Sequence, residues 1–168
     1  MDPSVIEEVR LTSFKSFADA VLPLDELTLL VGRNGSGKSN ALDGLWALSR
    51  LAQADDIRDA LDGGRDGPAV RGGVAGCAPL GESRFSLGCA IQTGEQQVEF
   101  DVTVQVEPTV QVVSEQLRLD GHIVLNTLPP STDSADITAV WDSPTERSVV
   151  FRAGRLLSTQ VLARIPAT

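Results

Sequence analysis

The chain has 168 residues, of which 42% are hydrophobic and 22% are charged. This composition is typical of a globular domain and excludes a wholly disordered chain or a coiled coil. No apolar run approaches the roughly 18 residues that a transmembrane helix needs. The net charge of −9 is spread along the chain and argues against polyanion binding by this chain alone. Two cysteines and one histidine are too few for a disulfide framework or a zinc site, so a reducing cytoplasm is the expected compartment.

Strands are expected in the first part of the chain, residues 4–62. Residues 5–11 have the pattern of a strand that turns at Phe14–Phe17, and residues 19–24 are a candidate second strand. Leu27–Val31 is a short apolar run without alternation. Such a run predicts a strand that is buried on both faces.

A Gly-rich turn follows this run, and helices are expected after it. Apolar residues at helical spacing predict a helix that begins near Lys38 and extends to Ala52. A shorter helix over 55–61 should end at the glycine pair that begins with Gly63. Residues 63–81 hold seven glycines and two prolines and are predicted to form a loop. This loop is longer than most connections without secondary structure. Three interpretations therefore remain open: the loop is functional, disordered or partly structured.

The part from residue 84 to residue 153 is predicted to be an antiparallel β-meander. Apolar and polar residues alternate along 98–107, as in a strand with one buried face. The alternation slips near Val113, which predicts a β-bulge. Asp120-Gly121 is a two-residue hairpin signal. Two further strands are expected at 137–141 and 148–152.

The segment Gly32–Ser39 reads Gly-Arg-Asn-Gly-Ser-Gly-Lys-Ser and fits the phosphate-loop pattern G-x-x-x-x-G-K-[ST] in full. Glycines allow successive backbone N–H groups to converge on a phosphate, and the following helix adds its positive end. Lys38 should reach the β- and γ-phosphates, and the Ser39 hydroxyl should coordinate Mg²⁺. A chance match in a chain of this length is expected about one time in a hundred. A buried strand leading into the loop and a helix leaving it form the expected context.

The residues around this loop resemble a known family. The lead-in 6–17 contains Phe-Lys-Ser-Phe, the loop 29–40 reads Asn-Gly-Ser-Gly-Lys-Ser-Asn at its end, and Leu42-Asp43-Gly44-Leu45 follows. Together they look like the start of an ABC-type ATPase head of the SMC/RecF/OLD-like group of AAA family ATPases, which act in DNA repair and phage defence. The resemblance implies an α/β fold with α+β character, namely the N-terminal lobe of a P-loop NTPase with an antiparallel β-meander subdomain.

The resemblance also implies roles for particular residues. ATP and Mg²⁺ are the implied cofactors, with Ser39 as a metal ligand. Lys15 is implied to lie near the nucleotide or DNA, with a solvated surface lysine as the alternative. Gln160 is the positional candidate for the family's inter-lobe glutamine, which binds Mg²⁺ and couples it to the partner subunit. The implied nucleotide-binding set is Gly32, Arg33, Asn34, Gly35, Ser36, Gly37, Lys38, Ser39 and Asn40.

The sequence departs from the family in what it lacks. After the phosphate loop, no apolar strand ends in the Asp-Glu pair that would hold Mg²⁺ and activate water, and no Leu-Ser-Gly-Gly-Gln signature is found. The chain therefore resembles a single incomplete head, with a phosphate-loop core (1–62), a Gly-rich loop (63–81), a β subdomain (84–153) and the start of the inter-lobe segment (154–168). We expect nucleotide binding with poor hydrolysis, turnover that needs a C-terminal half and a second head, and DNA contact only through the full assembly.

Two other functions remain open at this stage. A small-molecule P-loop kinase fits the length, but the period-2 pattern of the C-terminal half argues against its doubly wound fold. A non-catalytic interaction module with a silent loop would use the meander as a partner surface. A GTPase is excluded because neither Lys15 nor Lys38 lies in an Asn-Lys-x-Asp motif.

Several other residues are expected to be structural. His122 should be solvated, and Cys77 and Cys89 should be free thiols. Trp46 and Trp141 are expected to be packing residues. The aspartates between 55 and 66 are expected to form a solvated acidic face rather than a metal site.

Overall fold

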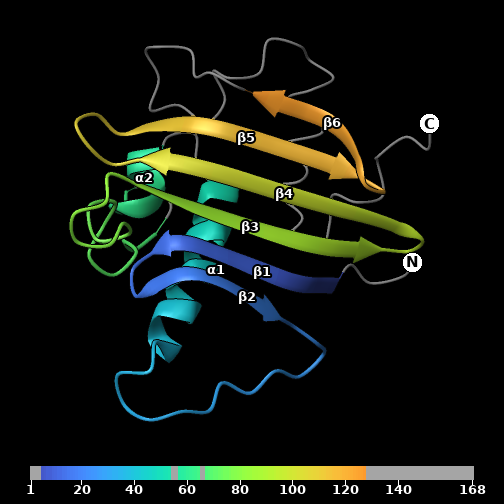
Figure 1. The fold of residues 1–168 in the computed structure, drawn as a ribbon, viewed down its shortest axis with the longest axis horizontal. Helices are drawn as coiled ribbons and strands as arrows, with labels where there is room; N and C mark the ends of the chain where they lie inside the picture. The colour runs from blue at the N-terminus through green and yellow to red at the C-terminus, as the bar shows by residue number, and fades with distance from the viewer. Residues whose placement is uncertain (1–4, 54–56, 65–66, 128–168) are drawn as a thin grey trace.

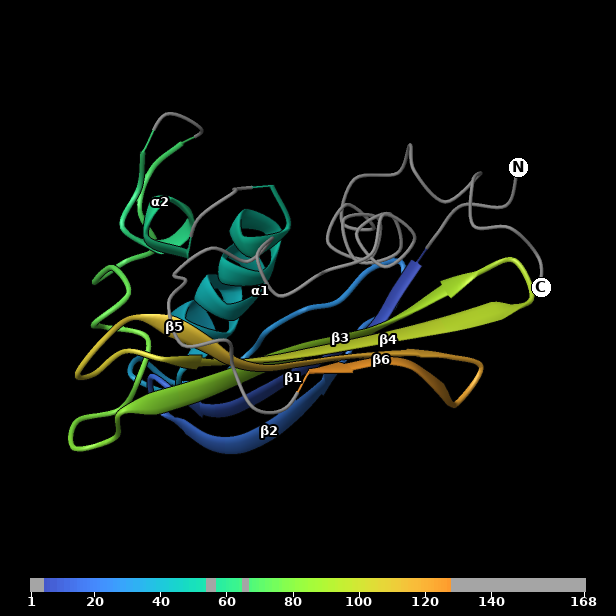
Figure 2. The ribbon, with the colours of Figure 1, turned by 90° about the horizontal axis from the view of Figure 1, so that it is seen from above.

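The structure is a computed structural model that describes residues 5–53, 57–64 and 67–127. It contains one six-stranded antiparallel sheet with two helices on one of its faces (Figures 1 and 2). The elements in chain order are β1 (Val5–Phe14), β2 (Phe17–Pro23), α1 (Lys38–Gln53), α2 (Ile57–Leu61), β3 (Arg84–Thr93), β4 (Gln96–Gln105), β5 (Gln111–Leu119) and β6 (His122–Thr127).

The strands of the lead-in and of the meander belong to the same sheet. Its order is β2-β1-β3-β4-β5-β6, and β1 pairs with β3 from Val5 opposite Gln92 to Thr12 opposite Ser86. The predicted fold class, an α/β phosphate-loop lobe with an antiparallel meander, is confirmed. The predicted limits of the incomplete head remain a prediction.

Local signals in the meander predicted its details correctly. The register between β4 and β5 shifts where Thr103 faces Ser114 and Val104 faces Val112, so Val113 is the extra residue of a bulge. Asp120 and Gly121 both have positive φ, at 49° and 77°, as the tight hairpin turn between β5 and β6 requires. The strands predicted at 137–141 and 148–152 lie outside the described residues.

The strand predicted over Leu27–Val31 is wrong in this structure. The segment between β2 and α1 has no regular secondary structure and lies at the lower end of the molecule in Figure 1. Leu27 is 79% exposed, Leu29 77% and Val31 90%. A strand forms only where a neighbouring strand accepts and donates its backbone hydrogen bonds, and the described residues provide none at this position.

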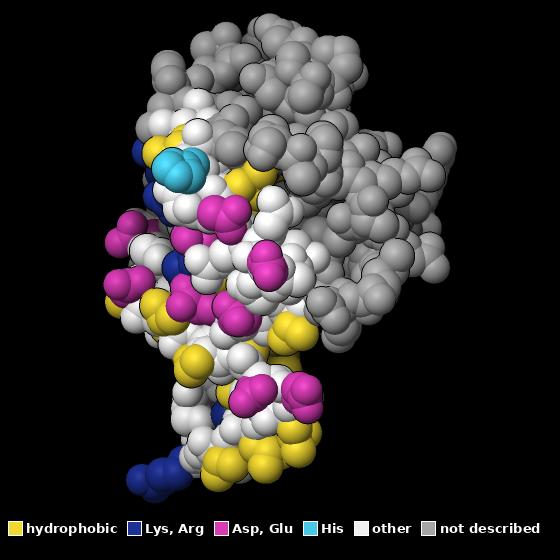
Figure 3. All heavy atoms as spheres, turned by 90° about the vertical axis from the view of Figure 1, so that its right-hand side faces the viewer, with side chains coloured by type: hydrophobic (Ala, Val, Ile, Leu, Met, Phe, Trp, Pro, Cys, Tyr) yellow, Lys and Arg dark blue, Asp and Glu magenta, His cyan; other side chains and the backbone are white. Residues whose placement is uncertain are grey.

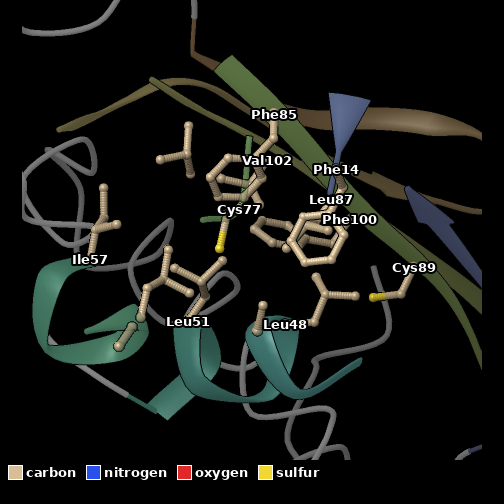
Figure 4. Packing of buried hydrophobic residues seen from close by; sticks show 14 of the residues in the cluster. Phe14, Leu48, Leu51, Ile57, Cys77, Phe85, Leu87, Cys89, Phe100 and Val102 are labelled. Atoms are coloured by element: carbon tan, nitrogen blue, oxygen red, sulfur yellow. The ribbon is translucent and has the colours of Figure 1, made fainter. Parts of the chain in front are cut away.

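The apolar core lies between the inner face of the sheet and the two helices. Figure 4 shows Leu48 and Leu51 of α1 and Ile57 of α2 pointing toward Phe14, Phe85 and their neighbours on the strands. The Phe14 and Phe85 rings meet edge to face with centroids 5.7 Å apart. This packing fixes the position of α1 and therefore of the residues at its first turn.

Gly44 allows α1 to lie close to β1. A Cβ atom at this position would lie 2.5 Å from Cδ2 of Leu11, whose side chain is fully buried. The helix therefore tolerates glycine here, despite its low helix propensity, because the sheet leaves no room for a methyl group.

The glycine-rich connection between α2 and β3 is partly structured. Its described part, from residue 67 to residue 83, forms a series of turns. These turns bury Val70, Val74 and Cys77 against the core. The connection is therefore a compact cover for one end of the core, held by apolar side chains.

The predictions for the thiols and for His122 are confirmed, and the prediction for Trp46 is wrong. Cys77 and Cys89 are free and buried, and burial raises the pKa of each to about 12. Both thiols therefore stay protonated at neutral pH and are inert as nucleophiles. His122 is exposed at the first position of β6. Trp46 is 42% exposed, because the sheet covers only the opposite face of α1.

The close approach of α1 to β1 yields a stability prediction. Gly44→Ala should lower the free energy of unfolding by about 1–3 kcal/mol through overpacking against Leu11, which outweighs a helix-propensity gain of about 1 kcal/mol. Urea denaturation followed by far-UV circular dichroism measures this change. Leu42→Ala, at a 56% exposed position on the same helix, is the control and should change stability by less than about 0.5 kcal/mol. A stabilised Gly44→Ala variant would contradict the packing argument.

Candidate functional site: a phosphate loop at the start of α1

The glycine-rich turn ends at the first residue of the longest helix, as the phosphate-loop pattern predicts. Lys38 begins α1. Gly35 and Gly37 have φ values of 82° and 91°, which side-chain-bearing residues rarely adopt. A Cβ atom at Gly37 would lie 3.2 Å from Ser16 Oγ and 3.3 Å from the Phe17 ring. The second glycine is thus needed both for the turn and for close contact with the turn between β1 and β2.

The ammonium group of Lys38 folds back over the loop. Its Nζ atom donates to the carbonyl oxygens of Gly32 and Arg33, each at 2.7 Å, and to Ser36 Oγ at 3.3 Å. These contacts match the three donors of an ammonium group. The longest of them, to a neutral hydroxyl, is the one that a phosphate oxygen would replace at least cost.

The first turn of α1 is suited to an anion. The first N–H groups of a helix have no partner within it and carry its positive end. No acidic side chain lies in this turn. Ser39 is exposed, and its hydroxyl makes no hydrogen bond within the described part of the chain. A hydroxyl oxygen in this position is a donor atom of the kind that Mg²⁺ prefers.

Lys15 is held beside the loop by an ion pair. Its side chain is only 9% exposed, and Nζ lies 3.2 Å from the Oδ2 atom of Asp43, one turn into α1. The Lys15 ammonium also donates to the carbonyl oxygen of Arg71. Its backbone N–H donates to the carbonyl oxygen of Cys77 at 2.8 Å. Lys15 is therefore a buried link between three segments and not a solvated surface lysine.

Arg71, in the glycine-rich connection, completes this cluster. Its guanidinium donates twice to Asp43 Oδ2, at 2.6 and 3.1 Å, and once to Asn40 Oδ1 at 2.8 Å. The Asn40 amide in turn donates to Ser16 Oγ at 2.7 Å. Asn40, at the end of the predicted loop, thus connects the β1–β2 turn to the connection that follows α2.

Sequence reasoning did not find Asp43 and Arg71 as site residues. Asp43 was visible within the family-like helix start, and Arg71 stands beside a glycine pair, but nothing in the spacing shows that they meet. Their pairing spans 28 positions and depends on how the turns of the connection fold. Gln160 lies outside the described residues. Among the described residues there is no group of three or more His, Cys, Asp or Glu side chains placed to hold a metal ion.

The cluster predicts a local stability effect. Asp43→Asn leaves the buried Lys15 ammonium and the Arg71 guanidinium without their shared carboxylate, which should cost about 1–3 kcal/mol. Amide hydrogen exchange of residues 70–77 should accelerate in this variant. Asp19→Asn, which alters an exposed carboxylate that accepts from Thr12, is the control and should change stability by less than about 0.5 kcal/mol. Unchanged exchange in Asp43→Asn would show that the ion pairs do not hold the connection.

The amino-acid sequence of this chain is similar to those of known proteins. Residues 5–103 match a family model described as an AAA ATPase domain. The DNA replication and repair protein RecF of Rhizobium leguminosarum bv. trifolii is 29% identical over 131 residues, which cover 76% of this chain and 33% of that protein. RecF of Agrobacterium fabrum is 32% identical over 119 residues, covering 69% of this chain and 27% of that protein.

A second type of relative and solved structures of RecF also match this chain. The chromosome partition protein Smc of Methanococcus voltae is 41% identical over 54 residues, which cover 32% of this chain and 4% of that protein. The solved structure of the recombination mediator protein RecF with ATP aligns with a TM-score of 0.47 and 15% identity, covering 73% of this chain and 29% of that one. The chain spans about a third of the length of the RecF proteins that it matches.

The family match includes the β1–β2 lead-in, the phosphate loop, α1 and most of β4. No helix among the described residues is long and apolar enough to cross a membrane. The family model matches more than half of the residues of this chain. The chain therefore belongs to the AAA ATPase domain family.

Proposed function

We propose that this chain binds Mg-ATP as the N-terminal half of a RecF- or SMC-like ATPase head. The observation that carries this proposal is the geometry at the start of α1. Two glycines with positive φ precede Lys38, whose ammonium lies over the loop, and the first helical turn is free of acidic side chains. This is the arrangement that a polyphosphate requires.

Each residue of the loop has a distinct proposed role. Backbone N–H groups of the segment 33–39 surround the β- and γ-phosphates, and Lys38 neutralises their charge. The Ser39 hydroxyl would hold Mg²⁺, which would supply charge neutralisation to the phosphates when bound. Asn40 and Lys15 are proposed to act behind the loop and not on the phosphates themselves. The Asn40 side chain contacts Ser16 and Arg71. The Lys15 side chain contacts Asp43. We propose that they hold the loop in position for the nucleotide.

Hydrolysis is proposed to need a second half. Phosphoryl transfer depends on a positioned water and on charge stabilisation around Mg²⁺. The sequence after the phosphate loop holds no apolar run ending in Asp-Glu that would supply the water-activating carboxylate. The RecF relatives are about three times as long as the stretch they share with this chain, so the missing groups have room in a further lobe.

A role in DNA repair is proposed only for a complete assembly. The matched relatives are named for DNA replication and repair and for chromosome partition. On the outer face of this sheet, however, Arg10 lies 2.9 Å from Asp101, and Arg118 lies 3.4 Å from Glu99. These arginines already have carboxylate partners, so this face does not favour direct contact with phosphates of DNA.

The alternatives have less support. A doubly wound kinase fold alternates strands and helices in a parallel sheet, whereas every strand pair described here is antiparallel. A silent interaction module would share this fold but would not bind nucleotide. Nucleotide titration therefore separates it from the proposed function.

The first test is the loss of binding in Lys38→Ala. Removing charge-assisted hydrogen bonds of about 1.5–3 kcal/mol should weaken Mg-ATP binding by about 10- to 150-fold. Isothermal titration calorimetry with Mg-ATP measures the affinity. Arg118→Ala, on the outer face of the sheet, is the matched control and should bind like the wild type. Equal affinity of Lys38→Ala and the wild type would reject the proposed function.

The second test is turnover by the chain alone. We expect the purified 168-residue chain to bind Mg-ATP but to release no more phosphate than the Lys38→Ala variant, because it lacks a water-activating carboxylate. A phosphate-release assay under saturating ATP measures this rate. Sustained turnover that depends on Lys38 would contradict the need for a second half.

A further inference from the structure

The phosphate loop carries the dipeptide Asn34-Gly35 in an exposed turn. The N–H of Ser36 donates to the carbonyl oxygen of Arg33 at 3.1 Å, so Asn34 and Gly35 are the two central residues of this turn. Both residues are exposed, and the segment that holds them lies at the lower end of the molecule in Figure 1. Figure 3 shows the same end projecting below the sheet into solvent. Water therefore reaches both residues.

An asparagine followed by glycine is open to deamidation by its own backbone. The nitrogen of the second residue attacks the side-chain carbonyl carbon of the first, and a side chain on the second residue would obstruct this approach. A Cβ atom built on Gly35 would meet nothing within 4 Å apart from its neighbours in the chain. Neither the Asn34 carboxamide nor the Gly35 N–H makes a hydrogen bond to another residue that the structure describes. Both reacting groups are thus accessible and unengaged.

Asn40, in the first turn of α1, differs from Asn34 in both respects. Its carboxamide donates to Ser16 Oγ at 2.7 Å and accepts from the Arg71 guanidinium at 2.8 Å. The N–H of the next residue, Ala41, donates to the carbonyl oxygen of Gly37 at 2.9 Å. The side chain and the attacking nitrogen are therefore both held in hydrogen bonds. Asn40 is an internal reference for the reactivity of an asparagine in this chain.

Positive charge beside the turn favours the reaction at Asn34. Deamidation begins with the loss of a proton from the Gly35 N–H and passes through a tetrahedral intermediate with a negatively charged oxygen. Lys38 Nζ donates to the Arg33 carbonyl oxygen at 2.7 Å, which places an ammonium group on the peptide unit that precedes Asn34. Lys38 also begins α1, whose positive end adds to this charge. Fixed positive charge of this kind stabilises both anionic species.

We propose that Asn34 is a deamidation site and that its conversion inactivates the phosphate loop. The Gly35 nitrogen forms a bond to Asn34 Cγ, the Cγ–Nδ2 bond breaks, and ammonia leaves with the proton of the Gly35 N–H. Water then opens the cyclic imide at one of its two carbonyl carbons, which gives isoaspartate or aspartate at position 34. Both products carry a carboxylate that asparagine lacks.

The effect on nucleotide binding rests on the proposed function. Isoaspartate adds a methylene group to the backbone, so the N–H groups that follow position 34 no longer converge on one phosphate. Either product also places a negative charge beside the phosphates. Asn34 should in turn react more slowly when Mg-ATP is bound, because a loop held around phosphates cannot bend into the cyclic imide.

The test follows the two asparagines over time. The full 168-residue chain is incubated at mildly alkaline pH with and without Mg-ATP, and mass spectrometry of its peptides measures conversion. Without nucleotide, Asn34 should convert about tenfold faster than Asn40 or more, because Asn40 has to break its hydrogen bonds first. Saturating Mg-ATP should slow conversion of Asn34 about tenfold or more, since it leaves less than about a tenth of the chains free.

Calorimetric titration then connects conversion with binding. The number of Mg-ATP sites per chain should fall in step with the fraction of Asn34 converted. Asn34→Gln is the matched control, because its longer side chain closes to an imide far more slowly. Whatever its initial affinity, this variant should keep its initial number of sites throughout the incubation.

Four results would overturn the proposal. They are conversion of Asn34 no faster than that of Asn40, equal conversion with and without Mg-ATP in a chain that binds it, equal Mg-ATP binding by converted and unconverted chains, and loss of sites in Asn34→Gln at the wild-type rate.

The same measurements separate this inference from the proposed function. If the fresh chain binds Mg-ATP and Asn34 stays intact, only the deamidation site is rejected. If Asn34 converts but the fresh chain binds no Mg-ATP, the proposed nucleotide site and the effect on binding are rejected, while the modification site stands.

Discussion

The attraction between a concentrated negative charge and the open end of α1 is the interaction on which the site depends. The whole chain carries a net charge of −9, so a phosphate is repelled at long range. The proposed site meets this repulsion with donors that are fixed in advance: the helix N–H groups and Lys38, on a backbone turned by two glycines. In a chain with this net charge, the local hydrogen bonds to a phosphate have to be stronger than its long-range electrostatic repulsion by the chain.

The sheet supplies the rigidity that this arrangement needs. Gly44 brings α1 against β1, and the β1–β2 turn places Ser16 next to Gly37 and Asn40. The glycine-rich connection is drawn to the same place by Arg71 and Lys15, which share Asp43. The loop is thus supported from the helix, the turn and the connection together.

The sequence predicted what local patterns encode. Period-2 alternation marked β3 to β5, the slip at Val113 marked the bulge, and Asp120-Gly121 marked the hairpin, because each depends on neighbouring residues alone. Residues 27–31 were assigned as a strand from their apolar character, but pairing depends on a neighbour that the described chain does not have. The meeting of Asp43 with Arg71 required the folded connection, since charge and spacing do not specify contacts between distant segments.

The placement of the two lysines has a practical consequence. Lys15 is shielded and engaged with a carboxylate, whereas Lys38 lies on the exposed loop and is the accessible lysine. Amine-directed dyes, biotin reagents and sensor-chip coupling that modify a lysine side chain therefore reach the phosphate loop at Lys38 before Lys15. Attachment through cysteine is equally poor because both thiols are buried, so a peptide tag is the suitable handle for immobilising this protein with its phosphate loop intact.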